Sequence, residues 1–361
     1  MPKKVLFLVP YPTGESPSQR FRFEHYFSEL EARGFSYTVR SFLNQNNWQI
    51  FFKPGRFPQK GWALLTGFAR RWASVFEAPF YDFIFIHRET TPVGPPVMEW
   101  LLAKLLRRKI IYDFDDAIWL TDRKHEPWFL RVLKWRSKVE LTCRWAYKIS
   151  CGNEYLADYA RRFNRRVYYM PTVVDTAHWH NPALYPEVHR DPAKITIGWT
   201  GSHSTLKYLK DLVPVLQQLE LEYHNLSILI IADQKPDFDL SSLLFIPWSK
   251  AAEVRDLMRI DIGIMPLPDD EWAKGKCGFK AIQYMALGIP AVVSPVGVNT
   301  QIVDHDRNGF VAATPQEWYA ILKKLIEDKA LIRQAGASSR QKIIDAYSVS
   351  STASSFISLF E

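Results

Sequence analysis

Short, nearly continuous apolar runs recur along the chain, and helical patterns follow most of them. Clear examples are residues 4–9 and 109–112 in the first half, and 195–199 and 226–232 in the second. Such runs are typical of parallel strands that are buried on both faces. The alternation of strand and helix favours doubly wound sheets. The sequence therefore predicts an α/β protein with two Rossmann-like domains.

A stretch of different composition separates the two series. Residues 178–192 are rich in Pro, His and Asn and show no periodicity, which is typical of a linker. We expect a first domain over residues 1–178 and a second over 193–345. The last segment, 346–361, is expected to form a helix that returns to the first domain. A chain of 361 residues is long enough for two separate cores.

The net charge of +8 indicates an anionic partner: nucleic acid, a nucleotide-sugar or an acidic membrane surface. No zinc-finger spacing or RNA-binding aromatic motif occurs, so nucleic acid is not expected. The three cysteines indicate a reducing compartment. The apolar start lacks a cleavage site, and no run approaches the ~18 apolar residues that span a bilayer. We expect a cytoplasmic protein, with peripheral contact to the inner face of the membrane as a further expectation.

Residues 274–299, KGKCGFKAIQYMALGIPAVVSPVGVN, read as a turn, a short helix and a buried strand. Gly288 stands where a helix end favours a left-handed residue, and Pro290 prevents the helix from resuming. Lys276 and Lys280 lie around the first turn of this helix. Free N–H groups, the positive end of the helix dipole and two ammonium groups together favour an anion site. An amphipathic helix with solvated lysines is the alternative.

The same segment resembles the donor-binding region of GT-B glycosyltransferases, in particular the retaining family 4. Residues 285–290, MALGIP, match the end of the family pattern, and Lys280 fits its bacterial surface-polysaccharide variant. Gln283 occupies the place of the second family glutamate, which holds the ribose hydroxyls, and an amide can still bond a hydroxyl. The first glutamate falls at Gly275 and is missing. The resemblance covers most of the chain and implies two domains that face a cleft.

A second donor loop follows the predicted strand at 195–199. Gly201 and Ser202 form a small-residue turn that opens a helix, a setting suited to phosphate oxygens. The resemblance places this loop beside the donor diphosphate and suggests Lys207 as a phosphate-binding lysine. Val298 and Asn299 follow the strand after the lysine-bearing helix, within reach of the same cleft. The expected donor-binding residues are Gly201, Ser202, Lys207, Lys276, Lys280, Gln283, Val298 and Asn299.

Polar residues also follow strands of the first half, where doubly wound sheets bind ligands. Ser18, Arg20 and Arg22 come after the first strand, and Arg88 and Glu89 come after the strand at 81–87. We expect these five residues on the acceptor side of the cleft. A solvated helix start and a simple ion pair are the respective alternatives.

Three carboxylates, Asp113, Asp115 and Asp116, follow the strand at 109–112. The resemblance makes Asp115 and Asp116 the counterparts of a His–Asp pair that lines the acceptor side, and we expect them to be catalytic. A D-x-D pattern can also hold Mg²⁺ or Mn²⁺ against a diphosphate, which would favour the metal-dependent GT-A fold. A helix cap formed by Asp115 or Asp116 is the third interpretation.

Aromatic and basic residues are mixed in two segments of the first half, residues 48–76 and 128–138. This mixture suits the headgroup boundary of an anionic bilayer. A helical hairpin that packs on its own domain is the favoured alternative for the first segment.

Together these features predict a glycosyltransferase of the hexosyltransferase type that uses a nucleotide-diphosphate sugar. Retention of configuration, no cofactor and no metal are expected. The acceptor would be a saccharide or a polyprenyl-linked saccharide in surface polysaccharide synthesis. Two further alternatives are a nucleotide-sugar epimerase of GT-B shape and a non-catalytic nucleotide-sugar-binding relative.

Overall fold

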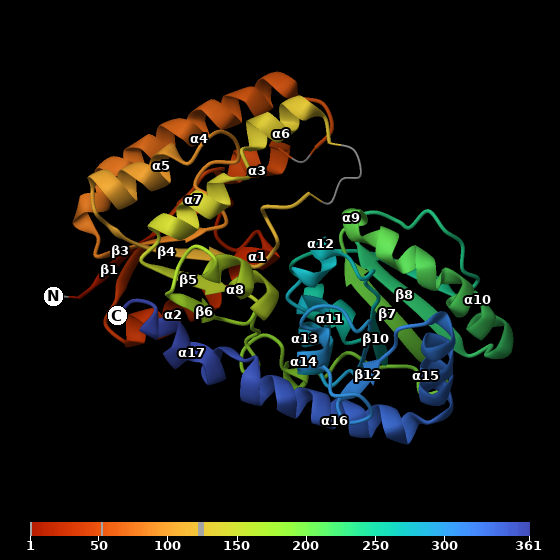
Figure 1. Cartoon of the computed structure of the whole chain (residues 1–361). Helices are drawn as coiled ribbons and strands as arrows, with labels where there is room; N and C mark the ends of the chain where they lie inside the picture. The colour runs from red at the N-terminus through yellow and green to blue at the C-terminus, as the bar shows by residue number, and fades with distance from the viewer. Residues whose placement is uncertain (1, 52, 122–125) are drawn as a thin grey trace. The chain divides into compact units, whose positions relative to one another are not determined.

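The chain forms two α/β units in the computed structural model, which describes residues 2–51, 53–121 and 126–361. The first unit contains Met1–Thr172 together with Thr352–Glu361, and the second contains Val173–Ser351. Each unit has one six-stranded sheet with helices packed around it (Figure 1). The predicted fold class is therefore confirmed.

The sheet of the first unit is parallel throughout and has the order β2-β1-β3-β4-β5-β6. Its interior strands are mostly apolar because helices cover both faces, and residues 5–9 of β1 are at most 1% exposed. The strands are β1 (Lys4–Val9), β2 (Ser36–Ser41), β3 (Phe83–His87), β4 (Lys109–Phe114), β5 (Lys148–Cys151) and β6 (Val167–Tyr169).

Helices of the first unit include α3 and α4 in the segment where the sequence suggested a helical hairpin. Trp48, Phe51 and Phe68 from this hairpin pack against a small core that contains Phe42, so the hairpin prediction is confirmed. The helices are α1 (Pro17–Arg20), α2 (Phe27–Ala32), α3 (Gln45–Phe51), α4 (Phe57–Glu77), α5 (Val97–Trp100) with the π-helical turn η3 (Leu101–Leu105), α6 (Trp128–Lys134), α7 (Lys138–Trp145) and α8 (Glu154–Arg161). Among the described residues, no helix is both long and apolar enough to cross a bilayer.

The sheet of the second unit is also parallel and has the order β12-β11-β10-β7-β8-β9. Its strands are β7 (Ile195–Gly201), β8 (Leu226–Ala232), β9 (Leu243–Pro247), β10 (Ile262–Met265), β11 (Ala291–Val293) and β12 (Gly309–Val311). Its helices are α9 (His203–Leu206), α10 (Val213–Glu222), α11 (Glu253–Leu257), α12 (Glu271–Lys274), α13 (Phe279–Ala286), α14 (Asn299–Ile302), α15 (Pro315–Glu327) and α16 (Lys329–Ala346).

The last helix, α17 (Val349–Ser358), begins in the second unit and ends on the first. Phe356 stacks on Tyr26 with ring centroids 4.2 Å apart, and the Tyr26 hydroxyl lies 2.6 Å from Thr352 Oγ1. Phe360 continues the contact against Phe83 at 5.8 Å. The first unit ends at Thr172, six residues before the predicted end at residue 178, and the second begins at Val173 and not at residue 193. A bridge between Val174 and Ser348 joins the start of the second unit to its end.

The stacked Phe356 ring makes the docking of α17 testable. Because the side chain is 1% exposed, Phe356→Ala removes buried apolar surface and leaves a cavity, at a cost of about 3–5 kcal/mol. We expect a lower midpoint for the first unit in urea unfolding followed by tryptophan fluorescence. Ser355→Ala, at an exposed position of the same helix, is the control and should leave the midpoint unchanged. Equal midpoints for the two variants would contradict this docking.

Candidate functional site

The carboxyl edge of the second sheet gathers the loops that carry the predicted donor residues. Strands β11, β10 and β7 are neighbours in the sheet and run parallel, so the loops after them leave from the same edge. The loop after β7 starts at Ser202, the loop after β10 leads through α12 to α13, and the loop after β11 leads to α14. Loops that are far apart in the sequence thereby become neighbours in space.

Two predicted donor residues, Lys280 and Gly201, both lie against the indole ring of Trp199. The ammonium of Lys280 lies 5.4 Å from the centre of the Trp199 ring, within range of a cation–π interaction. A Cβ added to Gly201 would lie 2.5 Å from Cη2 of the same indole, so only glycine fits there. Trp199 is 2% exposed and therefore forms a fixed platform under the lysine. Sequence reasoning missed Trp199, although a tryptophan directly before a small-residue turn was visible.

The start of α13 is shaped by Gly278, which precedes the helix with a φ of 66°. A Cβ at this position would lie 2.1 Å from Ile302 Cδ1 and 3.3 Å from Val298 Cγ1. The turn therefore packs directly against the loop after β11. In that loop Asn299 is 1% exposed and its amide donates to the Ser294 carbonyl at 3.0 Å. At the other end of the helix, Gly288 has a φ of 70°, which confirms the predicted left-handed cap.

The other predicted donor residues occupy distinct environments. The ammonium of Lys276 lies 5.1 Å from the centre of the Trp272 ring, and Lys207 lies 5.1 Å from Tyr208. The hydroxyls of Ser202 and Ser204 are 2.8 Å apart.

Gln283 differs from these residues because it is buried, with 2% of its surface exposed. Its Nε2 lies 3.4 Å from Nε2 of His180, a residue that sequence reasoning did not connect with the site. The predicted contact of Gln283 with ribose stays a prediction.

A chain of polar contacts crosses the carboxyl edge of the first sheet. Ser18 Oγ lies 3.1 Å from His87 Nε2, and His87 Nδ1 lies 2.7 Å from Asp113 Oδ2. Asp113 Oδ1 accepts from Ser150 Oγ at 2.7 Å and from Arg22 Nη2 at 2.5 Å. His87 and Ser150, which the sequence did not single out, complete this arrangement. Three segments of the first unit therefore converge on a carboxylate that belongs to a fourth, β4.

Asp113 is the charged centre of this arrangement and is 1% exposed. Burial by itself raises the pKa of its carboxyl, but the charge of Arg22 and the bonds from His87 and Arg22 outweigh burial and hold the pKa well below its usual range. Arg22 is 3% exposed and also donates to the Met170 carbonyl. The structure thus places Arg22, expected on the acceptor side, in the interior beneath Ser18.

Asp115 and Asp116, expected to be catalytic, both bind Arg88. Arg88 Nε donates to Asp115 at 2.8 Å and Nη2 donates to Asp116 at 2.6 Å. Burial lowers the pKa of Arg88, but the two carboxylates outweigh it and raise that pKa above its usual value. Arg88 has a φ of 60°, an uncommon conformation for a residue other than glycine. The ion pair that the sequence left open at Arg88 is therefore present.

The remaining acceptor-side residues lie nearby in the same unit. Glu89 pairs with Lys138 at 2.6 Å, and Arg20 is 6% exposed beside the Phe21 ring. The three aspartates that the metal-dependent alternative would have used are each paired with an arginine, because Asp113 binds Arg22 whereas the other two bind Arg88. Within residues 2–51, 53–121 and 126–361, no group of three or more His, Cys, Asp or Glu side chains is placed to hold a metal ion.

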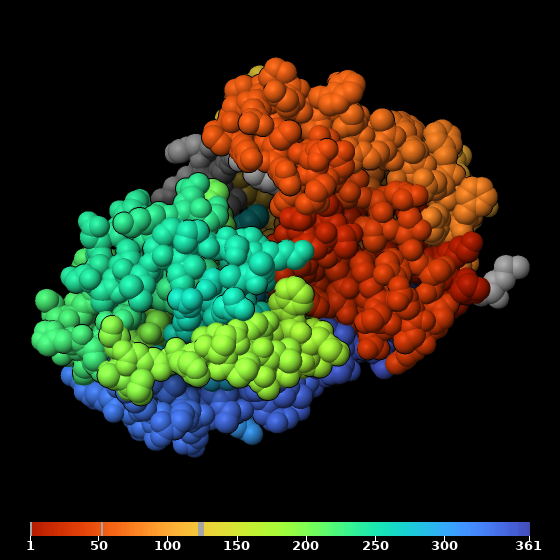
Figure 2. Space-filling model, turned by 180° about the vertical axis from the view of Figure 1, so that it is seen from behind, coloured from red at the N-terminus to blue at the C-terminus, as the bar shows by residue number. Residues whose placement is uncertain are grey.

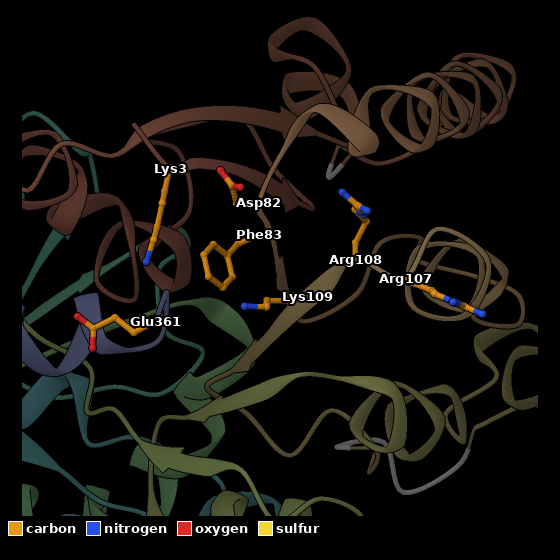
Figure 3. A pocket seen from close by; sticks show the side chains of 7 residues that line it. All are labelled: Lys3, Asp82, Phe83, Arg107, Arg108, Lys109 and Glu361. Carbon is orange, nitrogen blue, oxygen red and sulfur yellow. The ribbon is translucent and has the colours of Figure 1, made fainter. Parts of the chain in front are cut away.

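A pocket of about 290 Å³ lies at the opposite edge of the first sheet (Figure 3). It is located where strands β1, β3 and β4 begin, so it is separate from the predicted site residues at their carboxyl ends. Four basic side chains, two acidic side chains and one aromatic ring line it: Lys3, Arg107, Arg108, Lys109, Asp82, Glu361 and Phe83.

One segment of the chain matches a known protein family. Residues 194–328 match the protein-family model described as "Glycosyl transferases group 1". The matched range contains Trp199, Gly201, Lys280 and the loops of the carboxyl edge. No curated protein sequence matches the chain.

Solved structures with similar folds span the whole chain. Sucrose-phosphate synthase from Thermosynechococcus elongatus has a TM-score of 0.70 at 12% identity, covering 100% of this chain and 98% of its own. A glycosyltransferase from Rickettsia africae has a TM-score of 0.68 at 12% sequence identity, and the match covers 99% of this chain and 98% of that protein. HepE from Anabaena, solved with UDP and glucose, has a TM-score of 0.64 at 15% sequence identity, and the match covers 99% of this chain and 98% of that protein.

At these identities the solved structures establish the fold alone. The fold is GT-B, and the GT-A alternative is wrong because the second unit has a complete parallel sheet of its own. The family match adds the class of enzyme for the segment that it covers. The chain therefore has the GT-B fold, and its residues 194–328 match the glycosyl transferases group 1 family model.

Proposed function

We propose that this enzyme transfers a sugar, with retention of configuration, from a nucleotide-diphosphate sugar to a saccharide or polyprenyl-linked saccharide. Its role would be in surface polysaccharide synthesis. One observation carries the proposal. Lys280 and Gly201 both lie against the Trp199 ring, and all three residues belong to the segment that matches the family model. A UDP-sugar is the first donor to test, because the neighbour HepE was solved with UDP-glucose.

The chemical task at the donor is to stabilise the negative charge that develops on the leaving diphosphate. Lys280 and Lys276 supply positive charge, and the first turn of α13 supplies free backbone N–H groups beside Gly278. Such preorganised donors lower the barrier without a protein nucleophile. The platform under Lys280 limits its motion, which reduces the reorganisation needed during the reaction.

Acceptor handling is proposed for the first unit. Asp115 and Asp116 are 11% and 19% exposed, so their carboxylates are partly accessible although both bind Arg88. Ser18 is partly exposed above buried His87, which offers a hydroxyl held in a fixed orientation. We propose that these groups orient the attacking hydroxyl.

The decisive experiment incubates the protein with UDP- and GDP-sugars and analyses the products. Free nucleotide together with a glycosylated acceptor supports transfer. Epimerised nucleotide-sugar would instead support the epimerase alternative, and binding without any product would support a non-catalytic relative.

Replacement of Lys280 tests the donor assignment. Because a charge-assisted bond to phosphate is worth about 1.5–3 kcal/mol, Lys280→Ala should weaken UDP binding roughly ten- to a hundredfold while uridine binding stays unchanged. Isothermal titration calorimetry gives both affinities. Lys194→Ala, at the exposed start of β7 on the opposite edge, is the matched control and should bind UDP normally. Equal losses for UDP and uridine would mean that Lys280 is structural.

Replacement of Asp115 or Asp116 tests the acceptor assignment. Each change to Asn removes charge and nearly preserves shape, so donor affinity should stay normal while saturated turnover falls by roughly 10²-fold. Asp158→Asn, on the exposed surface of α8, should leave both quantities unchanged. A loss of donor affinity without a loss of turnover would overturn the division of roles.

Chelation tests the proposal that no metal is needed. If lysines and the start of α13 carry the diphosphate charge, turnover should persist after dialysis against EDTA. Complete loss that Mn²⁺ or Mg²⁺ restores would contradict this expectation.

A further inference from the structure

The outward face of α4 is apolar along nearly four turns. From residue 61 to 76, the exposed positions are Gly61, Trp62, Leu65, Ala69, Trp72, Ala73 and Phe76. Trp62 is 66% exposed, Leu65 65% and Phe76 75%. An ordinary surface helix turns such residues toward the core and its charges toward water. This helix does the reverse.

The orientation of α4 is fixed by its inward face. Arg71 is 1% exposed and donates to the carbonyls of Val9, Arg40 and Thr90 at 2.5–2.6 Å. Gly67 lies so close to Phe42 that an added Cβ would be 2.5 Å from its ring. Rotating the helix would leave a guanidinium and three carbonyls unpaired, so the aromatic residues must stay outside.

Two neighbouring helices extend the apolar surface. Helix α4 packs against α5, where Trp100 is 46% exposed and Leu105 of η3 is 64% exposed. Helix α6 adjoins the loop before α5, because Gly94 N–H donates to the Leu133 carbonyl at 2.8 Å. We name the exposed apolar side chains of these helices the aromatic face: Trp62, Leu65, Trp72, Phe76, Trp100, Leu105, Trp128, Phe129, Val132, Leu133 and Trp135.

Figure 1 shows α4 and α5 running side by side along the outer edge of the first unit. In Figure 2, the orange atoms of this region form a continuous projecting surface.

The charges around the aromatic face are almost all positive. No Asp or Glu occurs between residues 44 and 76, whereas Lys53, Arg56 and Lys60 precede or begin α4. Arg131 and Lys134 are exposed on α6. The acids nearest in sequence are paired or buried, because Glu77 pairs with Arg40, Glu126 pairs with Arg136 and Glu99 is 2% exposed.

The basic surface continues past the end of η3. Arg107 and Arg108, which follow η3 after Leu106, line the pocket of Figure 3. Arg108 also donates to the carbonyl of Pro79 at 3.4 Å, beside Phe80, which is 75% exposed.

We propose that the aromatic face docks onto the surface of an anionic lipid bilayer. Trp and Phe side chains enter the boundary between headgroups and acyl chains, and the surrounding Lys and Arg side chains meet the lipid phosphates. A second copy of the chain fits less well, because it would bring two basic rims together. The inference extends the proposed function, since a polyprenyl-linked acceptor lies at such a surface.

The test uses the full chain and sedimentation with vesicles of phosphatidylcholine alone or with about one third phosphatidylglycerol. The wild type should bind the anionic vesicles, and added salt should weaken the binding because it screens the basic residues. Trp62→Gln/Leu65→Gln/Trp72→Gln/Phe76→Gln should reduce binding at least tenfold. The control Leu221→Gln/Leu244→Gln removes two exposed apolar side chains of the second unit, which are 80% and 52% exposed, and should bind normally.

Three outcomes overturn the docking proposal. One is equal binding to neutral and anionic vesicles, or none. Another is unchanged binding by the quadruple variant. The third is a wild-type dimer in analytical ultracentrifugation that the quadruple variant abolishes while vesicles fail to bind, which would assign the face to a second copy. UDP affinity of the quadruple variant, measured in parallel, should be normal, so failure of docking is distinguishable from failure of the proposed donor chemistry.

Discussion

The first unit depends on the buried ion pair between Arg22 and Asp113. The carboxylate of Asp113 holds Arg22, His87 and Ser150, which come from the segment after β1 and from strands β3 and β5. A charge this deeply buried is tolerated only when it is paired and fully hydrogen-bonded. The requirement fixes the relative positions of the strand ends. It also fixes Ser18, whose hydroxyl is the outermost member of the chain of contacts.

The second unit organises its corresponding edge by close packing instead of a buried charge. Gly201 and Gly278 are positions at which any side chain would collide with Trp199 or Ile302. Close approach of backbone to side chain brings the loops after β7, β10 and β11 together. Lys280 then rests on an indole whose orientation the sheet has already set. The first unit therefore orders the carboxyl edge of its sheet with a buried ion pair, whereas the second unit orders the carboxyl edge of its sheet by close packing.

The orientation of α4 links the interior of the first unit to its surface. Arg71 satisfies three carbonyls inside the unit, so the aromatic residues of the helix cannot turn inward. Burial lowers the pKa of Arg71 to about 9, which indicates how far its guanidinium is removed from water. The exposed aromatic side chains are therefore a consequence of how the core is satisfied. They supply a surface that the two sheets themselves do not need.

The sequence by itself determined the fold class, because continuous apolar strands and the helical periods between them are local properties. It also determined the helix end at Gly288, since the left-handed conformation there is set by one residue. Only the tertiary structure decided that Arg88 takes both Asp115 and Asp116, that His87 meets Asp113, and that Gln283 is buried beside His180. Those contacts depend on strand order and on which residues leave each strand end, and periodicity carries no information on either. The exposure of the α4 aromatic residues was also decided by the tertiary structure. The sequence pattern defines an apolar face of the helix, but the packing partners determine whether that face points inward or outward.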